Sequence, residues 1–383
     1  MKKIKVFFIQ NILSFYRKPL FKKIAYDPSL DFTLILHASN EPHRDESWKV
    51  KRKTNLGYKH IILHTIKIKK QGYDPYIYLS YDYFYKLLKH KPDVVICAGF
   101  SFATIQSYIY AKLFNKKFII WMEGTKYTEQ FIGKKQQKIR EFLASKTNVF
   151  VVAGIMSKEY IKSLSNKNNR FYTSYNCNDT HFISEFCKER NQNDAMITLL
   201  YSGKMVESKG IFEVVKAFEV LNKKSDKYKL ILLGNGKLFN IVKEYIGSKK
   251  ITNVEMPGFV KFEESLKFWK NADILIHLAH YDRNPLIYTE ALAAGLPIIS
   301  SKYVGSNPEF VHNGKNGFVV DPFNVEGVCN AVEKVIDGNR DGSFSEYSRK
   351  LSKMLTYENA AKGFIDAIYY AYHINRSKSK NEK

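Results

Sequence analysis

The chain has 383 residues, a length that favours two domains, and its 45% hydrophobic and 26% charged residues are typical of globular proteins. This composition excludes a disordered or fibrous chain. Lysine and arginine number 61 against 37 aspartate and glutamate residues, which gives a formal net charge of +24 and suggests an anionic partner.

Short apolar runs alternate with helical patterns along the first half, which predicts βαβ units and a mostly parallel sheet. The predicted strands are Ile4–Ile9, Phe32–Leu36, Ile61–Ile68, Val94–Ala98, Phe118–Trp121 and Val149–Val152. The predicted helices are Pro19–Ala25, Tyr83–His90, Phe102–Phe114 and Gln136–Ser145.

The second half repeats this alternation, so the predicted fold class is α/β with two similar doubly wound domains. Its predicted strands are Thr198–Tyr201, Lys229–Leu233, Asn253–Met256, Ile274–His277 and Pro297–Ser300. Its predicted helices are Ile211–Asn222, Leu238–Ile246, Glu263–Trp269, Tyr288–Ala294, Val325–Ile336 and Tyr357–His373.

Composition along the chain predicts the domain boundaries. We expect an N-terminal domain over residues 1–178, a polar linker over 179–194 and a second domain over 195–352. A further helix within 353–374 and a basic, disordered tail over 375–383 complete the predicted organisation.

The cysteines and the apolar runs of the sequence indicate the cellular compartment of the protein. The four scattered cysteines form neither a disulfide framework nor a Cys-x-x-Cys pair, which indicates reduced thiols in a cytoplasmic protein. The apolar run after Met1 stops at Gln10, too short for a secretory signal. The uncharged stretch Val94–Ala111 contains polar residues and favours a strand, turn and helix over a membrane span.

Positive charge is concentrated in the first half, where residues 1–190 contain 34 basic and 15 acidic side chains. Between Glu46 and Asp74 there is no acid. The bases in that stretch are Lys49, Lys51, Arg52, Lys53, Lys59, Lys67, Lys69 and Lys70. Such a field attracts polyanions or an anionic membrane surface. The alternative is a set of ordinary solvated faces in a lysine-rich protein.

The segment Lys134–Lys146 is basic and amphipathic, with Ile139, Phe142 and Leu143 on one helical face. Such a helix can lie on lipid headgroups. It can equally pack its apolar stripe against a sheet.

The loop Ser202–Gly210 follows a predicted strand and opens a helix, so that helix N–H groups and two lysines converge on one point. This pattern indicates an anion site, although an ordinary loop with solvated lysines remains the alternative. The Gly-Lys-Ser/Thr ending of a Walker A loop is absent from it. Gly234-Asn235-Gly236 follows the next strand, at the edge where open sheets bind ligands.

Two acids stand eight residues apart around the start of a predicted helix. Asp282 lies just beyond a strand, and Glu290 lies within a small apolar run that is expected to be buried. A buried carboxylate needs hydrogen-bond donors, which the hydroxyls of a ligand can supply. A structural Glu that caps neighbouring backbone is the alternative.

These motifs resemble the retaining glycosyltransferases of family 4, also called group 1, which have the GT-B fold. The hallmark is an acid, seven residues and Glu-Ala, followed by a Gly-x-Pro strand, and Asp282, Glu290-Ala291 and Gly295-Leu296-Pro297 match it. The resemblance is specific over about residues 198–335. It implies two Rossmann-like domains facing each other across a cleft, with a C-terminal helix returning toward the first domain.

By this resemblance, Glu290 holds the ribose hydroxyls of a nucleotide sugar, and Asp282 faces the sugar. Lys204 and Lys209 neutralise the diphosphate, while Phe259 and Val260 frame the base. The other implied donor-binding residues are Gly203, Gly210, Gly234, Asn235, Gly236, Asn284, Pro285, Leu286 and Ile287.

The chain departs from the family pattern at four places. The first acid is usually Glu but here is Asp282, and the usual Gly-Arg is Gly203-Lys204, which loses a bidentate donor. Gln10-Asn11 replaces the glycine pair common after the first strand. By the resemblance, Glu123 is the candidate for the position of the family's acceptor-side catalytic histidine.

The resulting hypothesis is a retaining transferase that uses a nucleoside-diphosphate sugar, with uridine as the favoured base. Because the chain contains no Asp-x-Asp pair, we expect no metal cofactor, with lysines supplying the positive charge. The expected acceptor is lipid-linked or a polysaccharide in cell-surface glycan synthesis, with the enzyme cytoplasmic or peripheral on the inner membrane face. A nucleotide-sugar epimerase and a non-enzymatic polyanion-binding protein are the alternatives, and we expect no nucleic-acid partner.

Overall fold

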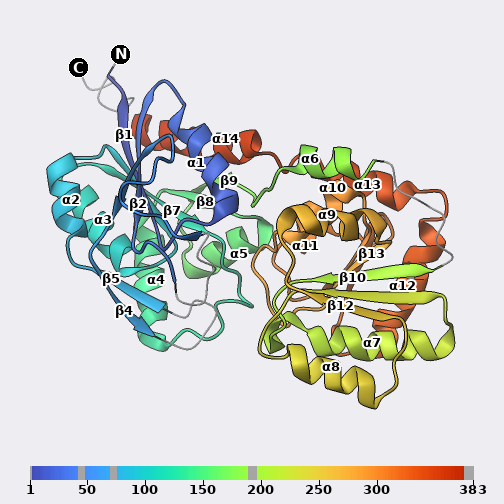
Figure 1. Cartoon of the computed structure of the whole chain (residues 1–383). Helices are drawn as coiled ribbons and strands as arrows, with labels where there is room; N and C mark the ends of the chain where they lie inside the picture. Colours follow the sequence, from blue (N-terminus) through green and yellow to red (C-terminus); the bar gives the residue numbers. More distant parts are fainter. Residues whose placement is uncertain (1, 42–47, 70–75, 189–195, 375–383) are drawn as a thin grey trace. The chain divides into compact units, whose positions relative to one another are not determined.

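The computed structural model describes residues 2–41, 48–69, 76–188 and 196–374 (Figure 1). Lys70, part of the predicted linker and the predicted tail lie outside these residues. The chain divides into two compact units, which are considered separately below. Unit 1 comprises Met1–Tyr175 and Tyr357–Lys383, and unit 2 comprises Asn176–Thr356.

Among its described residues, unit 1 contains a seven-stranded parallel sheet of order β3-β2-β1-β6-β7-β8-β9. The central strands are nearly continuous apolar runs because helices cover both faces of the sheet. The strands are β1 Ile4–Gln10, β2 Leu30–Leu36, β3 Lys59–Ile62, β6 Val94–Ala98, β7 Lys117–Met122, β8 Val149–Val152 and β9 Arg170–Thr173.

Helices of unit 1 lie on both sides of this sheet (Figure 1). They are α1 Lys18–Ala25, α2 Tyr83–His90, α3 Phe102–Leu113, α4 Lys134–Lys146, α5 Ile155–Leu164 and the C-terminal α14 Tyr357–His373. On one face, the ring of Phe8 in β1 contacts Phe21 of α1 and Phe364 of α14 at centroid distances of 4.9 and 5.1 Å. On the other face, Tyr83 and Tyr110 place α2 and α3 against the core.

The single predicted strand Ile61–Ile68 is wrong, because the structure has two strands there. β3 ends at Ile62, and β4 (Thr65–Lys69) pairs with β5 (Tyr76–Ser80) in a separate antiparallel sheet. Between them, the backbone N–H of His64 donates to the carboxylate of Asp82 at 3.0 Å. This side-chain bond takes the N–H away from the parallel ladder, so the apolar run is divided.

Unit 2 contains, in the part that the structure describes, a six-stranded parallel sheet of order β12-β11-β10-β13-β14-β15. Its strands are β10 Ile197–Ser202, β11 Tyr228–Leu233, β12 Val254–Gly258, β13 Ile274–His277, β14 Ile298–Ser301 and β15 Gly317–Val320. Its helices are α6 Thr180–Phe186, α7 Ile211–Lys224, α8 Phe239–Ser248, α9 Phe262–Asn271, α10 Ile287–Ala294, α11 Asn307–Phe310, α12 Val325–Gly338 and α13 Ser343–Ser352.

Both units therefore have the doubly wound α/β organisation predicted from the alternation of strands and helices. In unit 2, α7 and α12 share one buried cluster with β10 and β11. Figure 1 shows α9 and α10 over the opposite face of that sheet. In each unit the winding direction reverses beside the first strand, between β1 and β6 and between β10 and β13.

The segment predicted as a linker contains helix α6, which belongs to unit 2. The Asp179 side chain accepts a hydrogen bond from the N–H of Phe182 and caps this helix, and Ile183 is fully buried. An N-cap and two buried residues, Thr180 and Ile183, thus form a helix in a segment whose polar composition predicted a linker.

The buried positions also account for the cysteines, since all four are buried thiols. In the described ranges, no helix combines the length and apolar character needed to cross a bilayer. The stretch Val94–Ala111 instead forms β6, a turn and most of α3, as predicted.

Gly363 shows how closely α14 packs on unit 1. A Cβ at this position would lie 2.0 Å from the carbonyl oxygen of Thr173 in β9. Replacing a helical glycine by alanine ordinarily stabilises a protein by about 1 kcal/mol. We expect Gly363→Ala instead to lower the free energy of unfolding by about 1–3 kcal/mol, because α14 must move away from the strand.

Chemical denaturation measures this effect, with Gly247→Ala as the matched control. Gly247 lies in α8, where an added Cβ would meet no atom within 4 Å. The control should be neutral or stabilising. Stabilisation by both substitutions would contradict close packing of α14 on β9.

Candidate active site

The loops that follow β10, β11, β12 and β13 meet at the carboxyl edge of the unit 2 sheet. The N–H of Gly203 donates to the Leu233 carbonyl at 3.0 Å, and the N–H of Gly234 donates to the Gly258 carbonyl at 2.8 Å. Open α/β sheets bind ligands at this edge, where the winding direction reverses. In unit 2 that reversal lies between β10 and β13.

Two predicted glycines are required for this close approach of loops. Gly210 has a φ of +65°, and a Cβ there would lie 1.9 Å from the carbonyl oxygen of Leu278, just after β13. Gly234 has a φ of +123°, and its Cβ would lie 1.9 Å from the carbonyl oxygen of Gly203. Both positions need glycine for conformation and for space, so the loops form a compact edge.

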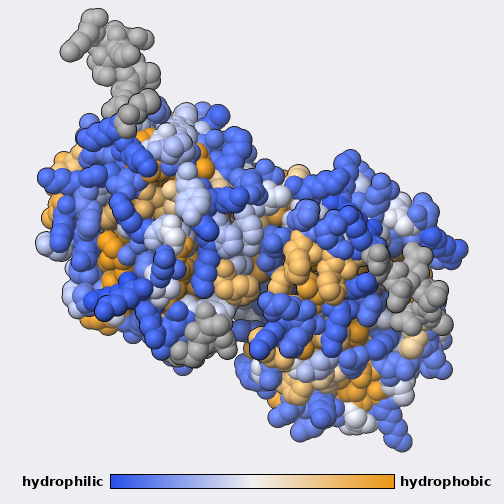
Figure 2. Space-filling view, turned by 45° about the horizontal axis from the view of Figure 1, so that its top comes forward, coloured by the Kyte–Doolittle hydropathy of each residue, from blue (hydrophilic) through white to orange (hydrophobic). Residues whose placement is uncertain are grey.

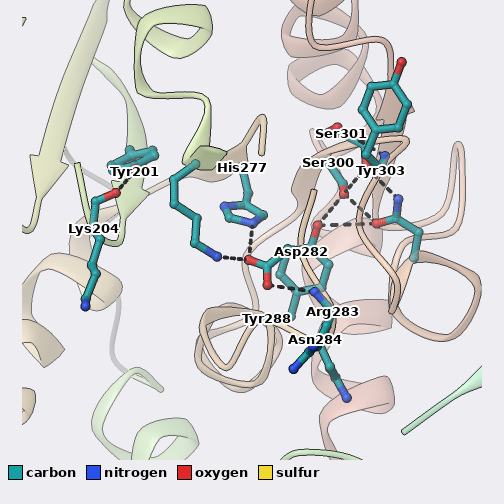
Figure 3. A network of polar contacts seen from close by, with 12 residues as sticks. Tyr201, Lys204, His277, Asp282, Arg283, Asn284, Tyr288, Ser300, Ser301 and Tyr303 are labelled. Atoms are coloured by element: carbon teal, nitrogen blue, oxygen red, sulfur yellow. Dashed lines mark hydrogen bonds and ion pairs between the residues drawn. The ribbon is translucent and has the colours of Figure 1, made fainter. Parts of the chain in front are cut away.

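A buried ion pair bridges the two loops that flank the reversal (Figure 3). Lys209 Nζ, from the loop after β10, lies 2.5 Å from Oδ2 of Asp282, from the loop after β13. The Asp282 side chain is only 4% exposed, whereas that of Lys209 is 24% exposed. The Nε2–H of His277 in β13 also donates to Oδ2 of Asp282, at 3.2 Å.

These contacts fix the charge of the buried carboxylate. Burial alone would raise the pKa of Asp282, but the Lys209 ammonium and the His277 hydrogen bond outweigh burial and hold that pKa well below its ordinary value. Burial lowers the pKa of His277, so its imidazole is neutral near pH 7 and acts as an N–H donor. Asp282 is therefore a carboxylate throughout the physiological range, with Lys209 as its counter-ion.

A second polar network lies beside this pair (Figure 3). Tyr288 of α10 is hydrogen-bonded to Ser300 of β14, and Ser300 Oγ donates to Oδ1 of Asn307 at 2.5 Å. The Asn307 amide in turn donates to the Ser301 carbonyl at 2.8 Å. The ring of Tyr288 contacts that of His277 at 5.8 Å, so this network holds the imidazole against Asp282.

Glu290 occupies the first turn of α10 and is almost fully buried. Asn178 Nδ2 donates to its Oε1 at 3.0 Å. Burial raises the pKa of Glu290 from 4.5 to about 7, and the Asn178 amide opposes this rise. Because Asn178 binds Oε1, the other carboxylate oxygen of Glu290 can accept a hydrogen bond from a ligand hydroxyl.

The segment before α10 supplies further donors. The first N–H groups of a helix have no partner within it, and in α10 these include the N–H groups of Leu286 and Ile287. Pro285 has no backbone N–H, so it cannot donate a hydrogen bond to a ligand there. Asn176 Nδ2 donates to the carbonyl oxygen of Asn284 at 3.2 Å and fixes the loop.

The remaining predicted donor-binding residues are exposed or half-buried along the same edge. Lys204 is exposed, and Figure 3 shows its side chain beside the Asp282 cluster rather than within it. Asn235, Gly236 and Phe259 are also exposed, and Val260 is half-buried. Their predicted contacts with a donor remain predictions.

Glu123 belongs to unit 1, directly after β7. Its carboxylate accepts a hydrogen bond from Arg17 Nη2 at 2.6 Å, and the Arg17 guanidinium lies 4.4 Å from the ring centroid of Trp121. Its assignment to the acceptor side stays a prediction.

Sequence reasoning missed His277, Asn178 and Asn176 as parts of the site. His277 is a polar residue at the end of an apolar strand, which is a usable signal. The two asparagines lie at the end of the predicted N-terminal domain, just before the predicted linker, and gave no comparable signal. Across the described ranges, no group of three or more His, Cys, Asp or Glu side chains is placed to hold a metal ion.

Comparison with known proteins finds a family match over the part of the chain that contains the candidate site. Residues 183–353 match the family model described as "Glycosyl transferases group 1" and include the stretch 198–335 that carries the sequence resemblance. CapM of Staphylococcus aureus, a capsular polysaccharide biosynthesis glycosyltransferase, is 22% identical over 230 residues, covering 56% of this chain and 58% of CapM. The poly(glycerol-phosphate) alpha-glucosyltransferase of Bacillus subtilis is 26% identical over 182 residues, covering 47% and 27%. The chain thus spans less than two thirds of these two relatives.

Solved structures extend the similarity in fold to both units. HepE of Anabaena in complex with UDP has a TM-score of 0.73 at 15% identity and covers 96% of this chain and 100% of that one. The lipopolysaccharide outer core galactosyltransferase WaaB in its apo form gives a TM-score of 0.73 at 17% identity, with 96% and 99% covered. The predicted GT-B fold is confirmed, and residues 183–353 are similar to the family model of group 1 glycosyl transferases.

The raised pKa of Glu290 makes stability depend on pH. Between pH 4.5 and about 7 the folded chain keeps a proton on Glu290 that the unfolded chain has lost. The proton on Glu290 therefore stabilises the folded chain fully below pH 4.5, and this stabilisation is lost as the pH rises to about 7. Glu290→Gln has no such titration, so its unfolding free energy should rise relative to wild type across this window, by about 3 kcal/mol.

Urea unfolding of both proteins at pH 5 and pH 7.5 checks this expectation. Glu264→Gln, in an exposed position of α9, corrects for the loss of one formal charge. A difference between Glu290→Gln and wild type that is the same at both pH values would show that Glu290 is ionised in the folded state at pH 5.

Proposed function

We propose that the protein is a metal-independent, retaining glycosyltransferase of family 4 that transfers a sugar from a UDP-sugar to a lipid-linked or polysaccharide acceptor. The buried Lys209–Asp282 pair at the sheet reversal carries the proposal, since it lies inside the residues that match the family. HepE with bound UDP supports the choice of nucleotide. CapM, named for capsular polysaccharide biosynthesis, supports a role in cell-surface glycan synthesis.

Departure of a nucleoside diphosphate builds negative charge on the leaving phosphate and positive charge on the sugar ring. Lys209 keeps donor hydrogens beyond the one directed at Asp282, and these can hold the phosphate. The first N–H groups of α10, which have no partner within the helix, add to this stabilisation. The Asp282 carboxylate supplies the negative charge that a cationic ring favours.

Retention follows when the acceptor attacks from the side on which the diphosphate leaves. The acceptor hydroxyl oxygen forms a bond to the anomeric carbon as the bond from that carbon to the phosphate oxygen breaks. The hydroxyl proton passes to the departing phosphate oxygen. The Bacillus subtilis relative is an alpha-glucosyltransferase, and an α linkage formed from an α-linked nucleotide sugar is retention.

Glu290 is proposed to accept hydrogen bonds from the ribose hydroxyls, because it is buried and one of its oxygens is already oriented by Asn178. Lys204 is proposed to reach the diphosphate, and Phe259 with Val260 to frame the uracil. Glu123, held by Arg17, is proposed to contact the acceptor. Because lysine ammonium groups supply the positive charge in this arrangement, the transfer needs no divalent ion.

The basic composition of unit 1 supports a second part of the proposal, attraction to an anionic membrane surface where a lipid-linked acceptor resides. Lys51, Arg52 and Lys53 are exposed, although Arg52 Nη2 lies 2.8 Å from His64 Nε2. Peripheral association at the inner face of the membrane would place unit 1 beside its acceptor.

Lys209 is the most direct test of the enzyme. Lys209→Ala should lower the rate of sugar transfer from UDP-sugars by about 100-fold or more, because charge on the leaving phosphate is no longer stabilised. Since this change leaves Asp282 buried without its counter-ion, the double variant Lys209→Ala/Asp282→Asn separates catalysis from folding. The double variant should regain stability but not activity.

UDP release and product formation with a panel of UDP-sugars give the measurement. Lys216→Ala, an exposed change on α7, is the matched control and should keep the wild-type rate. Full turnover by Lys209→Ala would contradict the proposal. Epimerised UDP-sugar without any acceptor would support the epimerase alternative instead.

Asn178 is predicted to act through Glu290. Asn178→Ala removes the amide that lowers the pKa of Glu290, so this pKa should rise above about 7. If ionised Glu290 binds ribose, the loss in UDP affinity should be several-fold at pH 6.5 and should disappear near pH 8.5.

Calorimetric titration of UDP across this pH range measures the effect. Asn339→Ala removes a comparable side-chain amide at the end of α12 and is the control. An equal loss of affinity at every pH would indicate that Asn178 has only a structural role.

A further inference from the structure

Three helices of unit 1 form one continuous outer layer. Between α2 and α3, the hydroxyls of Tyr83 and Ser107 are hydrogen-bonded at 2.9 Å. Between α3 and α4, the rings of Tyr108 and Phe142 meet edge to face at 5.5 Å. The surface defined by α2, α3 and α4 is called the α2–α4 surface below.

Large apolar side chains project from this surface into solvent. On α3, Phe102, Ile109 and Leu113 recur at spacings of seven and four residues and therefore lie along one stripe. Leu113 is 67% exposed, and Phe142 of α4 is 48% exposed. The other exposed large apolar or aromatic side chains of these helices are Tyr85, Leu88 and Ile139. On the side drawn in Figure 2, hydrophobic residues lie among hydrophilic ones at the surface of unit 1.

The amphipathic character of α4 is thus divided between two environments. Leu143 and Ala144 pack in the core, as the sheet-packing alternative predicts. Ile139 and Phe142, predicted to share a face with Leu143, stay exposed. Packing against unit 1 therefore does not use the full apolar content of the helix.

The charge of the surface is almost entirely of one sign. The sequences of α2, α3 and α4 contain a single acidic residue, Glu141, which accepts a hydrogen bond from Gln137. Arg140 is engaged with Glu129. The lysines of the three helices are Lys86, Lys89, Lys112, Lys134, Lys135, Lys138 and Lys146.

We propose that the α2–α4 surface binds an anionic lipid bilayer, with the lysines at the phosphate level and the projecting apolar side chains between headgroups. Apolar and aromatic side chains surrounded by lysines are the pattern of interfacial helices, and lysines snorkel while apolar groups enter the boundary. Each lysine near an anionic surface strengthens binding by about fivefold. An acidic protein would satisfy the charges but would leave the scattered aliphatic side chains without a matching apolar site.

This inference deepens the proposed function, because the surface would bring the enzyme to a lipid-linked acceptor. It rests on the proposed function only for the biological role of membrane binding. Membrane binding itself is measured without catalysis. The two proposals can therefore fail separately.

Co-sedimentation of the full chain with vesicles tests the inference. We expect at least tenfold stronger binding to phosphatidylcholine vesicles containing 30 mol% phosphatidylglycerol than to pure phosphatidylcholine, in line with the charge of the surface. The apolar double variant Ile109→Ser/Leu113→Ser should lose at least tenfold. The charge variant Lys112→Gln/Lys135→Gln/Lys138→Gln should lose about 100-fold, as expected for three lysines.

Matched controls come from exposed positions on α7, on α8 and at the C-cap of α8 in unit 2. Val220→Ser/Ile241→Ser removes two exposed apolar side chains, and Lys216→Gln/Lys243→Gln/Lys249→Gln removes three exposed charges. Both controls should bind anionic vesicles within about twofold of wild type. All α2–α4 variants should keep wild-type UDP affinity, because they change only the surface of unit 1.

Absence of binding to anionic vesicles would overturn the inference, as would equal losses in the controls. Retention of the chain on immobilised polyglutamate without vesicle binding would overturn it in favour of an acidic protein partner. Vesicle binding that depends on the α2–α4 surface, in a chain that transfers no sugar, would support the inference and reject the proposed enzyme.

Discussion

A buried charge pair at the reversal of the unit 2 sheet is the interaction on which the site depends. Asp282 is removed from water, and a carboxylate there is tolerated because Lys209 and His277 contact it directly. Lys209 follows β10 and Asp282 follows β13, so the ion pair forms only when these two strands are neighbours. Gly210 makes this possible, because its missing Cβ lets the β10 loop lie against the backbone after β13. Folding and the chemistry of the site thus share one constraint.

The surroundings of the two site carboxylates shift their pKa values in opposite directions. Asp282 has its pKa lowered by an ammonium and a hydrogen bond, whereas Glu290 has its pKa raised to about 7 by burial with an amide as its identified partner. The first is a permanent charge suited to stabilising a cationic sugar ring. The second changes protonation in the physiological range and is suited to hydroxyl recognition. A hydrogen-bond network through Tyr288, Ser300 and Asn307 keeps the intervening elements in place.

Much of the fold could be predicted because buried parallel strands are continuous apolar runs, and these runs are legible in the sequence. The exceptions depend on single tertiary contacts. The bond from the His64 N–H to Asp82 ends β3, and the Asp179 cap starts α6. In the site, the sequence indicated Asp282, Glu290 and Lys209 through their spacing and family resemblance. It could not indicate Asn178, which reaches Glu290 across 112 residues, nor the direction of the Lys204 side chain, which depends on local packing.

A crystal structure of the chain with bound UDP tests the role of the Lys209–Asp282 pair most directly. We expect the diphosphate oxygens within hydrogen-bond distance of Lys209 Nζ while Lys209 still contacts Asp282, and we expect the ribose hydroxyls to donate to Glu290. UDP bound away from the β10 and β13 loops, or bound there with Lys209 turned from the phosphates, would contradict the proposed role.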